Sequence, residues 1–90
     1  MGHDFFSVTA QPSELAHARL GMAVAVRAMG GAVERNRIRR LIRESFRLHR
    51  AVVPALDIVI GVRPNARGAA ATDLRESLER LWDRLKRSST

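Results

Sequence analysis

Ninety residues, 46% of them hydrophobic and 28% charged, suffice for one small globular domain and are too few for two. Sixteen lysines and arginines against nine acidic residues give a net charge of +7, which favours a polyanionic partner, a nucleic acid before an acidic membrane surface. The absence of cysteine excludes disulfides and thiolate metal sites, and no apolar run is long enough for a membrane span or a signal peptide, so we expect a soluble, cytoplasmic protein.

Two β-strands are the first predicted elements. Residues 5–10 are rich in strand-forming side chains, and residues 19–26 alternate between larger apolar side chains and small ones. We expect these two runs to pair with each other as antiparallel neighbours. Phe5 and Phe6 point to opposite sides of the first strand, so one of them should face the core. The other is a candidate for stacking on single-stranded RNA.

A long basic helix is predicted over residues 30–50, after the break made by Gly30 and Gly31 and before the stop at Pro54. At 100° per residue, its apolar arc contains Ile38, Leu41, Ile42, Ser45, Phe46, Leu48 and His49. Arg35 lies at the flank of this arc. The opposite half carries Asn36, Arg37, Arg39, Arg40, Arg43, Arg47 and Arg50.

The cationic half of this helix indicates a nucleic-acid contact. Arginines at this density repel one another and do not help folding, so an external polyanion is the simplest reason for them. Glu44 is expected to pair with Arg40, four residues earlier in the chain. Asn36 both donates and accepts hydrogen bonds, which suits base edges or 2′-hydroxyl groups. A membrane-surface role is disfavoured because the core needs the apolar arc.

The remaining chain predicts one more strand and one more helix. Residues 56–62 are almost continuously apolar, which is typical of an interior, parallel strand covered on both faces. Residues 63–68 are expected to form a loop. A helix should start near Thr72 as its N-cap, with Trp82 as an anchor in a buried stripe of Leu74, Leu78, Leu81, Trp82 and Leu85. The order predicts an α/β (α+β) two-layer sandwich, in which a basic crossover helix and a C-terminal helix pack on a small mixed sheet.

No residues of the chain form a recognisable catalytic constellation. There is no nucleophile–base pair and no glycine loop with the spacing that cradles a phosphate. The three histidines, His3, His17 and His49, lack the spacing of metal ligands. We therefore expect neither a catalytic residue nor a metal site on this chain.

Residues 30–47 read GGAVERNRIRRLIRESFR. This segment resembles the signature of the bacterial ribonuclease P protein component, with its Arg-Asn-Arg core, basic pair, two aliphatics and Arg-Glu-x-Phe-Arg. The strands at 19–26 and 57–59 also sit where that family places them. The resemblance covers residues 5–85 and is specific over 30–47.

The resemblance implies a fold like domain 2 of ribosomal protein S5, with a left-handed crossover, and a role as partner of a catalytic RNA. In the family, the RNA holds Mg²⁺ and cleaves the 5′ leader from precursor tRNA, while the protein supports the RNA and grips the leader; no further protein partner is implied. The residues that the resemblance assigns to RNA binding are Arg27, Arg35, Asn36, Arg37, Arg39, Arg40, Arg43 and Arg47. Phe5 and Phe6 are candidates for the leader groove.

The chain departs from the family pattern at three places. Arg27-Ala28 stands where two lysines are usual, and Gly31 stands where Asn is common. The first strand begins almost at once, so we expect a single domain over residues 1–90 that lacks the usual N-terminal helix, and leader binding that is less secure than RNA-subunit binding. The alternatives are a ribosomal-type or RNA-chaperone module and a helix-in-groove DNA regulator, the last disfavoured by the strand at 56–62.

Overall fold

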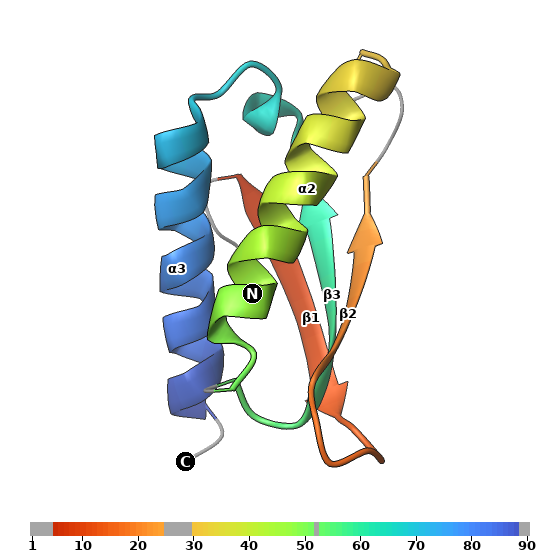
Figure 1. Ribbon diagram of the computed structural model, residues 1–90, viewed down its shortest axis with the longest axis vertical. Helices are drawn as coiled ribbons and strands as arrows, with labels where there is room; N and C mark the ends of the chain where they lie inside the picture. Colours follow the sequence, from red (N-terminus) through yellow and green to blue (C-terminus); the bar gives the residue numbers. More distant parts are fainter. Residues whose placement is uncertain (1–4, 25–29, 52, 89–90) are drawn as a thin grey trace.

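The computed structural model describes residues 5–24, 30–51 and 53–88. Three strands form one sheet, and two long helices cover one of its faces (Figure 1). The elements are β1 (Phe6–Pro12), β2 (Arg19–Ala23), α2 (Ala32–His49), β3 (Leu56–Val62), the short 3-10 helix η1 (Pro64–Ala66) and α3 (Ala71–Ser88). This arrangement confirms the predicted two-layer α+β sandwich with a mixed sheet.

The order of strands in the sheet differs from the prediction. β3 lies in the middle, antiparallel to β1 with Val8 opposite Ile60, and parallel to β2 with Leu20 opposite Ile58. The predicted pairing of residues 5–10 with residues 19–26 is therefore wrong. The most apolar strand takes the centre, where both of its edges find a partner. Pro12 ends β1 on an outer edge, where a missing N–H is tolerated.

β3 is covered on one face only, so the prediction that both its faces are buried is also wrong. Ile58 and Ile60 point to the helices and are buried, whereas Val59 between them is 46% exposed. Because both helices lie on the same side of the sheet, every second residue of β3 faces the open side. The run of β-branched side chains at residues 58–60 reflects strand propensity here rather than burial on two faces.

The basic helix connects two parallel strands that are neighbours in the sheet. In Figure 1, β2 and β3 both point upward, β3 lies to the left of β2, and α2 lies in front of the sheet. When the connecting helix lies in front and the second strand lies to the left of the first, the crossover is left-handed. This agrees with the family resemblance and runs against the general preference for right-handed crossovers.

The two predicted helices form close to the expected residues. Gly30 has φ 75°, in the left-handed region, and so makes the expected break before α2. The apolar stripe of α3 is entirely buried, which confirms the prediction, although α3 begins at Ala71 and not with Thr72 as its N-cap. Leu48, predicted to face the core, is 77% exposed because it lies at the edge of the apolar arc in the last turn of α2.

Ser45 and Trp82 join α2 to α3 within the core. The indole Nε1 of Trp82 donates a hydrogen bond to Ser45 Oγ at 2.8 Å, and its ring lies 5.7 Å from that of Phe46. Both Ser45 and Trp82 are buried, so this is a satisfied polar contact between the helices. Trp82 is thus the anchor of α3 that its sequence position predicts, and it holds the cationic face of α2 toward solvent.

Candidate nucleic-acid interface

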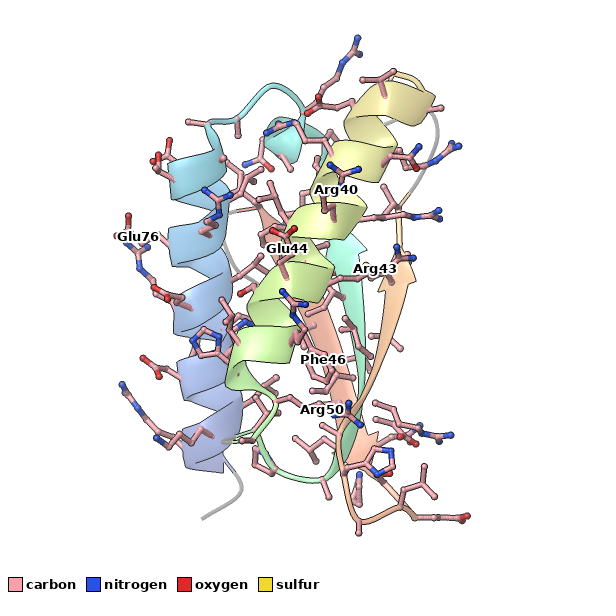
Figure 2. The ribbon with its side chains drawn as sticks, in the orientation of Figure 1. Arg40, Arg43, Glu44, Phe46, Arg50 and Glu76 are labelled. Atoms are coloured by element: carbon pink, nitrogen blue, oxygen red, sulfur yellow. The ribbon has the colours of Figure 1, made fainter. Side chains whose placement is uncertain are left out.

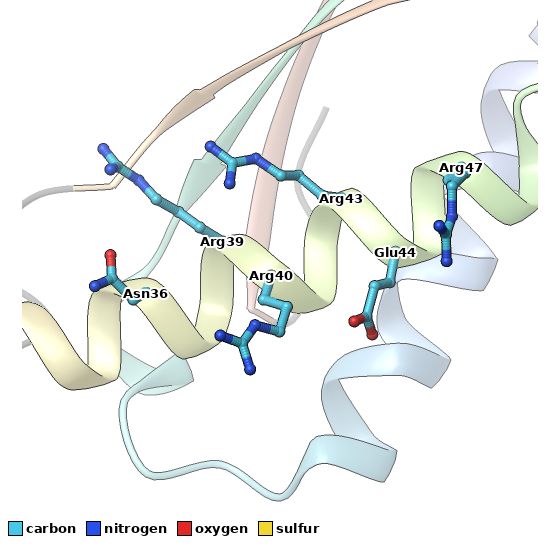
Figure 3. Close-up of a pocket in the computed structure, with 6 residues that line it drawn as sticks. All are labelled: Asn36, Arg39, Arg40, Arg43, Glu44 and Arg47. Atoms are coloured by element: carbon cyan, nitrogen blue, oxygen red, sulfur yellow. The ribbon is translucent and has the colours of Figure 1, made fainter.

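The arginines of α2 leave the helix in two directions. Figure 3 shows Arg39 and Arg43 directed together to one side of α2, while Arg40 and Glu44 point to the other side. Their positions follow from helical spacing, since residues four apart lie one above the other. A shallow depression along the outer face of the helix is lined by Asn36, Arg39, Arg40, Arg43, Glu44 and Arg47.

Four of these guanidinium groups have no partner among the described residues. In the part of the chain that the structure describes, no side-chain hydrogen bond or ion pair is formed by Arg39, Arg40, Arg43 or Arg47. The expected ion pair between Glu44 and Arg40 is likewise absent from this part, although both residues line the same depression. The cationic charge of this face is therefore left for a molecule outside the domain.

Arg37 is engaged within the domain, unlike its neighbours. Its Nη2 donates to Glu34 Oε1 at 2.7 Å and to the Ala69 carbonyl at 3.0 Å, and the Gly68 N–H donates to the same Glu34 oxygen at 3.0 Å. These bonds attach the first turns of α2 to the loop before α3. Helical spacing alone puts Arg37 on the cationic half of the helix. The structure shows that its side chain binds the loop before α3. Its contact with RNA stays a prediction.

The Glu34 and Arg37 contact predicts a pH-dependent share of stability. The Arg37 guanidinium, followed by the Gly68 N–H, holds the pKa of Glu34 below its usual range. A carboxylate with a depressed pKa stabilises the fold above its unfolded pKa, about 4.3, and loses that contribution as the pH falls through its folded pKa. The contribution is present at neutral pH and disappears in acid.

Glu34→Gln is expected to lower the free energy of unfolding at pH 7 by less than about 1 kcal/mol, since the pair is partly exposed. The difference from the wild type should shrink as the pH falls below about 4.3, the unfolded pKa of Glu34, and should vanish only below its lower folded pKa, where both states of the wild type carry the proton. Urea unfolding at pH 7 and pH 3 measures this. Glu44→Gln is the matched control on the same helix, and an equal loss in both variants at pH 7 would contradict the role of Glu34.

Asn36 and Arg35 occupy different environments beside the free arginines. Asn36 is exposed and lines two depressions, the one on the outer face of α2 and another between α2 and the start of α3. Arg75 of α3, which was not among the predicted RNA-binding residues, lines the second depression and adds a cation there. Arg35 lies at the flank of the helix as predicted, and its Nε is buried with no hydrogen-bond partner among the described residues.

The two phenylalanines of the proposed leader groove lie at the start of β1. Phe6 is fully buried, which confirms that one of the pair faces the core. Phe5 is partly buried against the same core, with its ring 6.4 Å from that of Phe6 in an edge-to-face arrangement. Its role in a leader groove stays a prediction. Arg27 lies outside the described residues.

An ion pair that was not predicted from the sequence joins β2 to β3. Arg19 of β2 donates two hydrogen bonds of 2.8 Å to the two carboxylate oxygens of Asp57, its register partner on β3. This contact holds the pKa of Asp57 below its usual range. No local pattern indicates this pair, because it depends on the parallel pairing of β2 with β3.

His49 makes contacts within the fold, on its own helix and toward α3. The Nδ1 of His49 lies 2.8 Å from the Ser45 carbonyl, and its Nε2 lies 3.8 Å from a carboxylate oxygen of Glu79 on α3. Among residues 5–24, 30–51 and 53–88, no three His, Asp or Glu side chains come together in a way that could hold a metal ion. Nor does any helix of this part have the length and apolar character needed to cross a membrane.

Comparison with known proteins places this geometry in a family. A family model described as Ribonuclease P matches residues 1–86. The chain is 38% identical over 88 residues to the ribonuclease P protein component of Aliivibrio fischeri, covering 98% of the chain and 75% of that relative. It is 43% identical over 84 residues to the ribonuclease P protein component of Acinetobacter baylyi, covering 93% of the chain but only 64% of that relative.

A solved structure agrees with these sequence matches. The fold superimposes on that of the Staphylococcus aureus RNase P protein with a TM-score of 0.86 and 33% sequence identity, over 92% of this chain and 76% of the other. The family model covers the basic helix, its free arginines and both flanking strands. On these matches in sequence and fold, the chain belongs to the ribonuclease P protein family.

Proposed function

We propose that this chain binds the catalytic RNA of ribonuclease P and, in that complex, assists the removal of the 5′ leader from precursor tRNA. The observation that carries the proposal is the row of guanidinium groups on α2 that have no partner in the described part of the chain, in a member of this family. Those groups are held outward because the opposite side of α2 is docked through Ile38, Ile42 and Ser45. The complex is proposed to work in the cytoplasm.

The free arginines suit the backbone of a structured RNA. A guanidinium group offers a planar fork of donors that can grip a phosphate with two hydrogen bonds. Arg39, Arg43 and Arg47 recur every four residues, so they form a row along the helix axis rather than a single point of charge. Asn36, exposed at one end of this row, can read a base edge or a 2′-hydroxyl group.

The chemistry is proposed to belong to the RNA. When bound to that RNA, Mg²⁺ supplies the activated water and the charge neutralisation for phosphodiester hydrolysis. The described residues of this chain offer no cluster of carboxylates or imidazoles for the ion. The protein's own residues neutralise phosphates, orient the RNA and contribute a surface for the leader, with Phe5 as the candidate stacking side chain. None of them is assigned a catalytic role.

Reconstitution with a ribonuclease P RNA at low Mg²⁺ concentration tests the proposal. Bound cationic side chains should replace part of the screening that Mg²⁺ gives the RNA, so the protein should restore leader cleavage under conditions where the RNA alone is inactive. Raising Mg²⁺ should reduce the difference. An RNA that shows no binding and no stimulated cleavage with the protein at any salt concentration would overturn the proposal.

A general RNA-binding module is the competing function, and bound RNA distinguishes the two. Sequencing of the RNA that co-purifies with the protein should give one dominant structured RNA together with precursor tRNAs. A profile dominated by bulk ribosomal RNA would favour the module. The salt dependence of binding does not separate them, because both depend on phosphate contacts.

A further inference from the structure

We infer that the RNA-binding surface continues beyond the signature residues into a cleft at the C-terminal end of α2, where Arg47 and Arg50 hold the sugar–phosphate backbone of the same RNA. This inference rests on the proposed function and adds Arg50 and His17 to the RNA-contacting residues. Arg50 lies on the cationic half of α2 but beyond the family signature, which ends at Arg47, and the resemblance does not assign it to RNA binding. His17 lies in the loop after β1.

Three segments of the chain meet at this cleft, which we call the α2-end cleft. They are residues 16–18 of the β1–β2 loop, residues 47–51 at the end of α2, and residues 53–55 before β3. Its apolar lining consists of four alanines and Val53, of which Ala18 and Val53 are only 3% and 7% exposed. Arg47, Arg50 and His17 are its polar residues, and all three are exposed.

Arg47 makes this cleft continuous with the outer face of α2. It lines both the α2-end cleft and the depression that contains Asn36 and Arg43. With Arg50 added, the arginines at 39, 43, 47 and 50 are four, four and three residues apart, so they form one stripe along the helix, about 16 Å long. Figure 2 shows Arg50 directed from the end of α2 toward the side where the β1–β2 loop lies.

The charge of the α2-end cleft suits an anion. Among the described residues, no acidic side chain lines the cleft, and its charged residues are Arg47 and Arg50. Within the described chain, Arg50 forms no ion pair or side-chain hydrogen bond. The C-terminal end of a helix carries about half a negative charge, which disfavours an anion. Two full positive charges on Arg47 and Arg50 outweigh it.

The shape of the cleft favours the backbone of RNA over a base. Alanine side chains allow a ribose and phosphate to come close, and the lining contains no Phe or Trp on which a base would stack. Phosphate contacts of this kind fix the register and angle of a protein on a nucleic acid without reading its sequence. An acidic peptide would also satisfy the charge, but continuity with the arginine row through Arg47 favours RNA.

Arg50→Glu tests the inference, with Arg84→Glu as the matched control. Arg84 is exposed on α3. It follows Arg75, which faces α2, by nine residues, so the two side chains point to opposite sides of α3. Arg50→Glu is expected to weaken binding to ribonuclease P RNA about tenfold at moderate salt and to lower the slope of log affinity against log salt by about 0.7–0.9, the value for one phosphate contact. Arg84→Glu should change neither. Equal binding by the two variants would overturn the inference.

A tethered probe locates the contact independently of any loss of affinity. The chain has no cysteine, so Ala51→Cys places a single thiol in the wall of the cleft for an iron chelate that generates hydroxyl radicals. The chelate should cut the RNA at one local site, and the same chelate at Asp83→Cys, on the exposed side of α3, should not. If the RNA binds but is not cut from Ala51→Cys, the RNA contact in the α2-end cleft is refuted. Binding of an acidic protein in the cleft in place of RNA would also refute it. Failure of the unmodified protein to bind the RNA would refute the proposed function itself.

Discussion

Reversal of two charges in the arginine row, by Arg39→Glu together with Arg43→Glu, is expected to abolish assembly with ribonuclease P RNA at moderate salt. Each hydrogen bond to a charged group contributes about 1.5–3 kcal/mol, and each reversal also adds repulsion from phosphate. Loss of two such contacts corresponds to at least about a hundredfold weaker binding, since 1.4 kcal/mol is a factor of about ten. Filter binding or band-shift titration over a range of salt concentrations measures this.

The same double reversal should leave the fold intact. Neither side chain has a partner within the described chain, and the core residues of α2 lie on the opposite side of the helix. Removing like charges from one face should hold or raise the melting temperature. The matched control is Arg63→Glu with Arg84→Glu, which changes the net charge equally at two exposed positions outside α2. Assembly that survives the α2 reversal, or falls equally in the control, would contradict the role of this face.

The parts of the structure that depend on local spacing could be predicted from the sequence. α2 and α3 follow from the period of their apolar residues, and the buried stripe from Leu74 to Leu85 was predicted residue by residue. The free arginines follow in the same way, because a side chain opposite Ile38 on a helix must leave the core. The family signature added the left-handed crossover, which general rules of handedness would have reversed.

The parts that depend on distant segments could not be predicted. Residues 5–10 could pair with residues 19–26 or with residues 56–62. Both outer strands pair with the most apolar strand, at 56–62, and the local pattern of each strand does not indicate its partner. Arg37 looked identical to its neighbours on a helical wheel. Its bond to the Ala69 carbonyl exists because the chain returns to α2 thirty-two residues later. The α2-end cleft similarly needs three separate segments to meet.

Trp82→Ala is expected to destabilise the domain far more than any change to a surface arginine or glutamate. Removal of a buried aromatic side chain costs about 3–5 kcal/mol. A domain of this size has a total stability of about 5–13 kcal/mol, so the variant should be close to unfolding. The substitution removes both the contact with Phe46 and the hydrogen bond to Ser45. Because Trp82 is the only tryptophan, urea unfolding must be followed by circular dichroism rather than fluorescence.

Two further variants separate packing from hydrogen bonding at this contact. Trp82→Phe keeps a ring beside Phe46 but leaves the buried hydroxyl of Ser45 without its donor, at a cost of about 1–3 kcal/mol. Adding Ser45→Ala to Trp82→Phe should recover part of that loss, since it removes the unpaired hydroxyl. Trp82→Ala with unchanged stability would show that α3 does not need this anchor. Trp82 is buried on the side of α2 opposite the arginine row. The RNA affinity of Trp82→Ala should therefore fall only in proportion to the loss of folded protein.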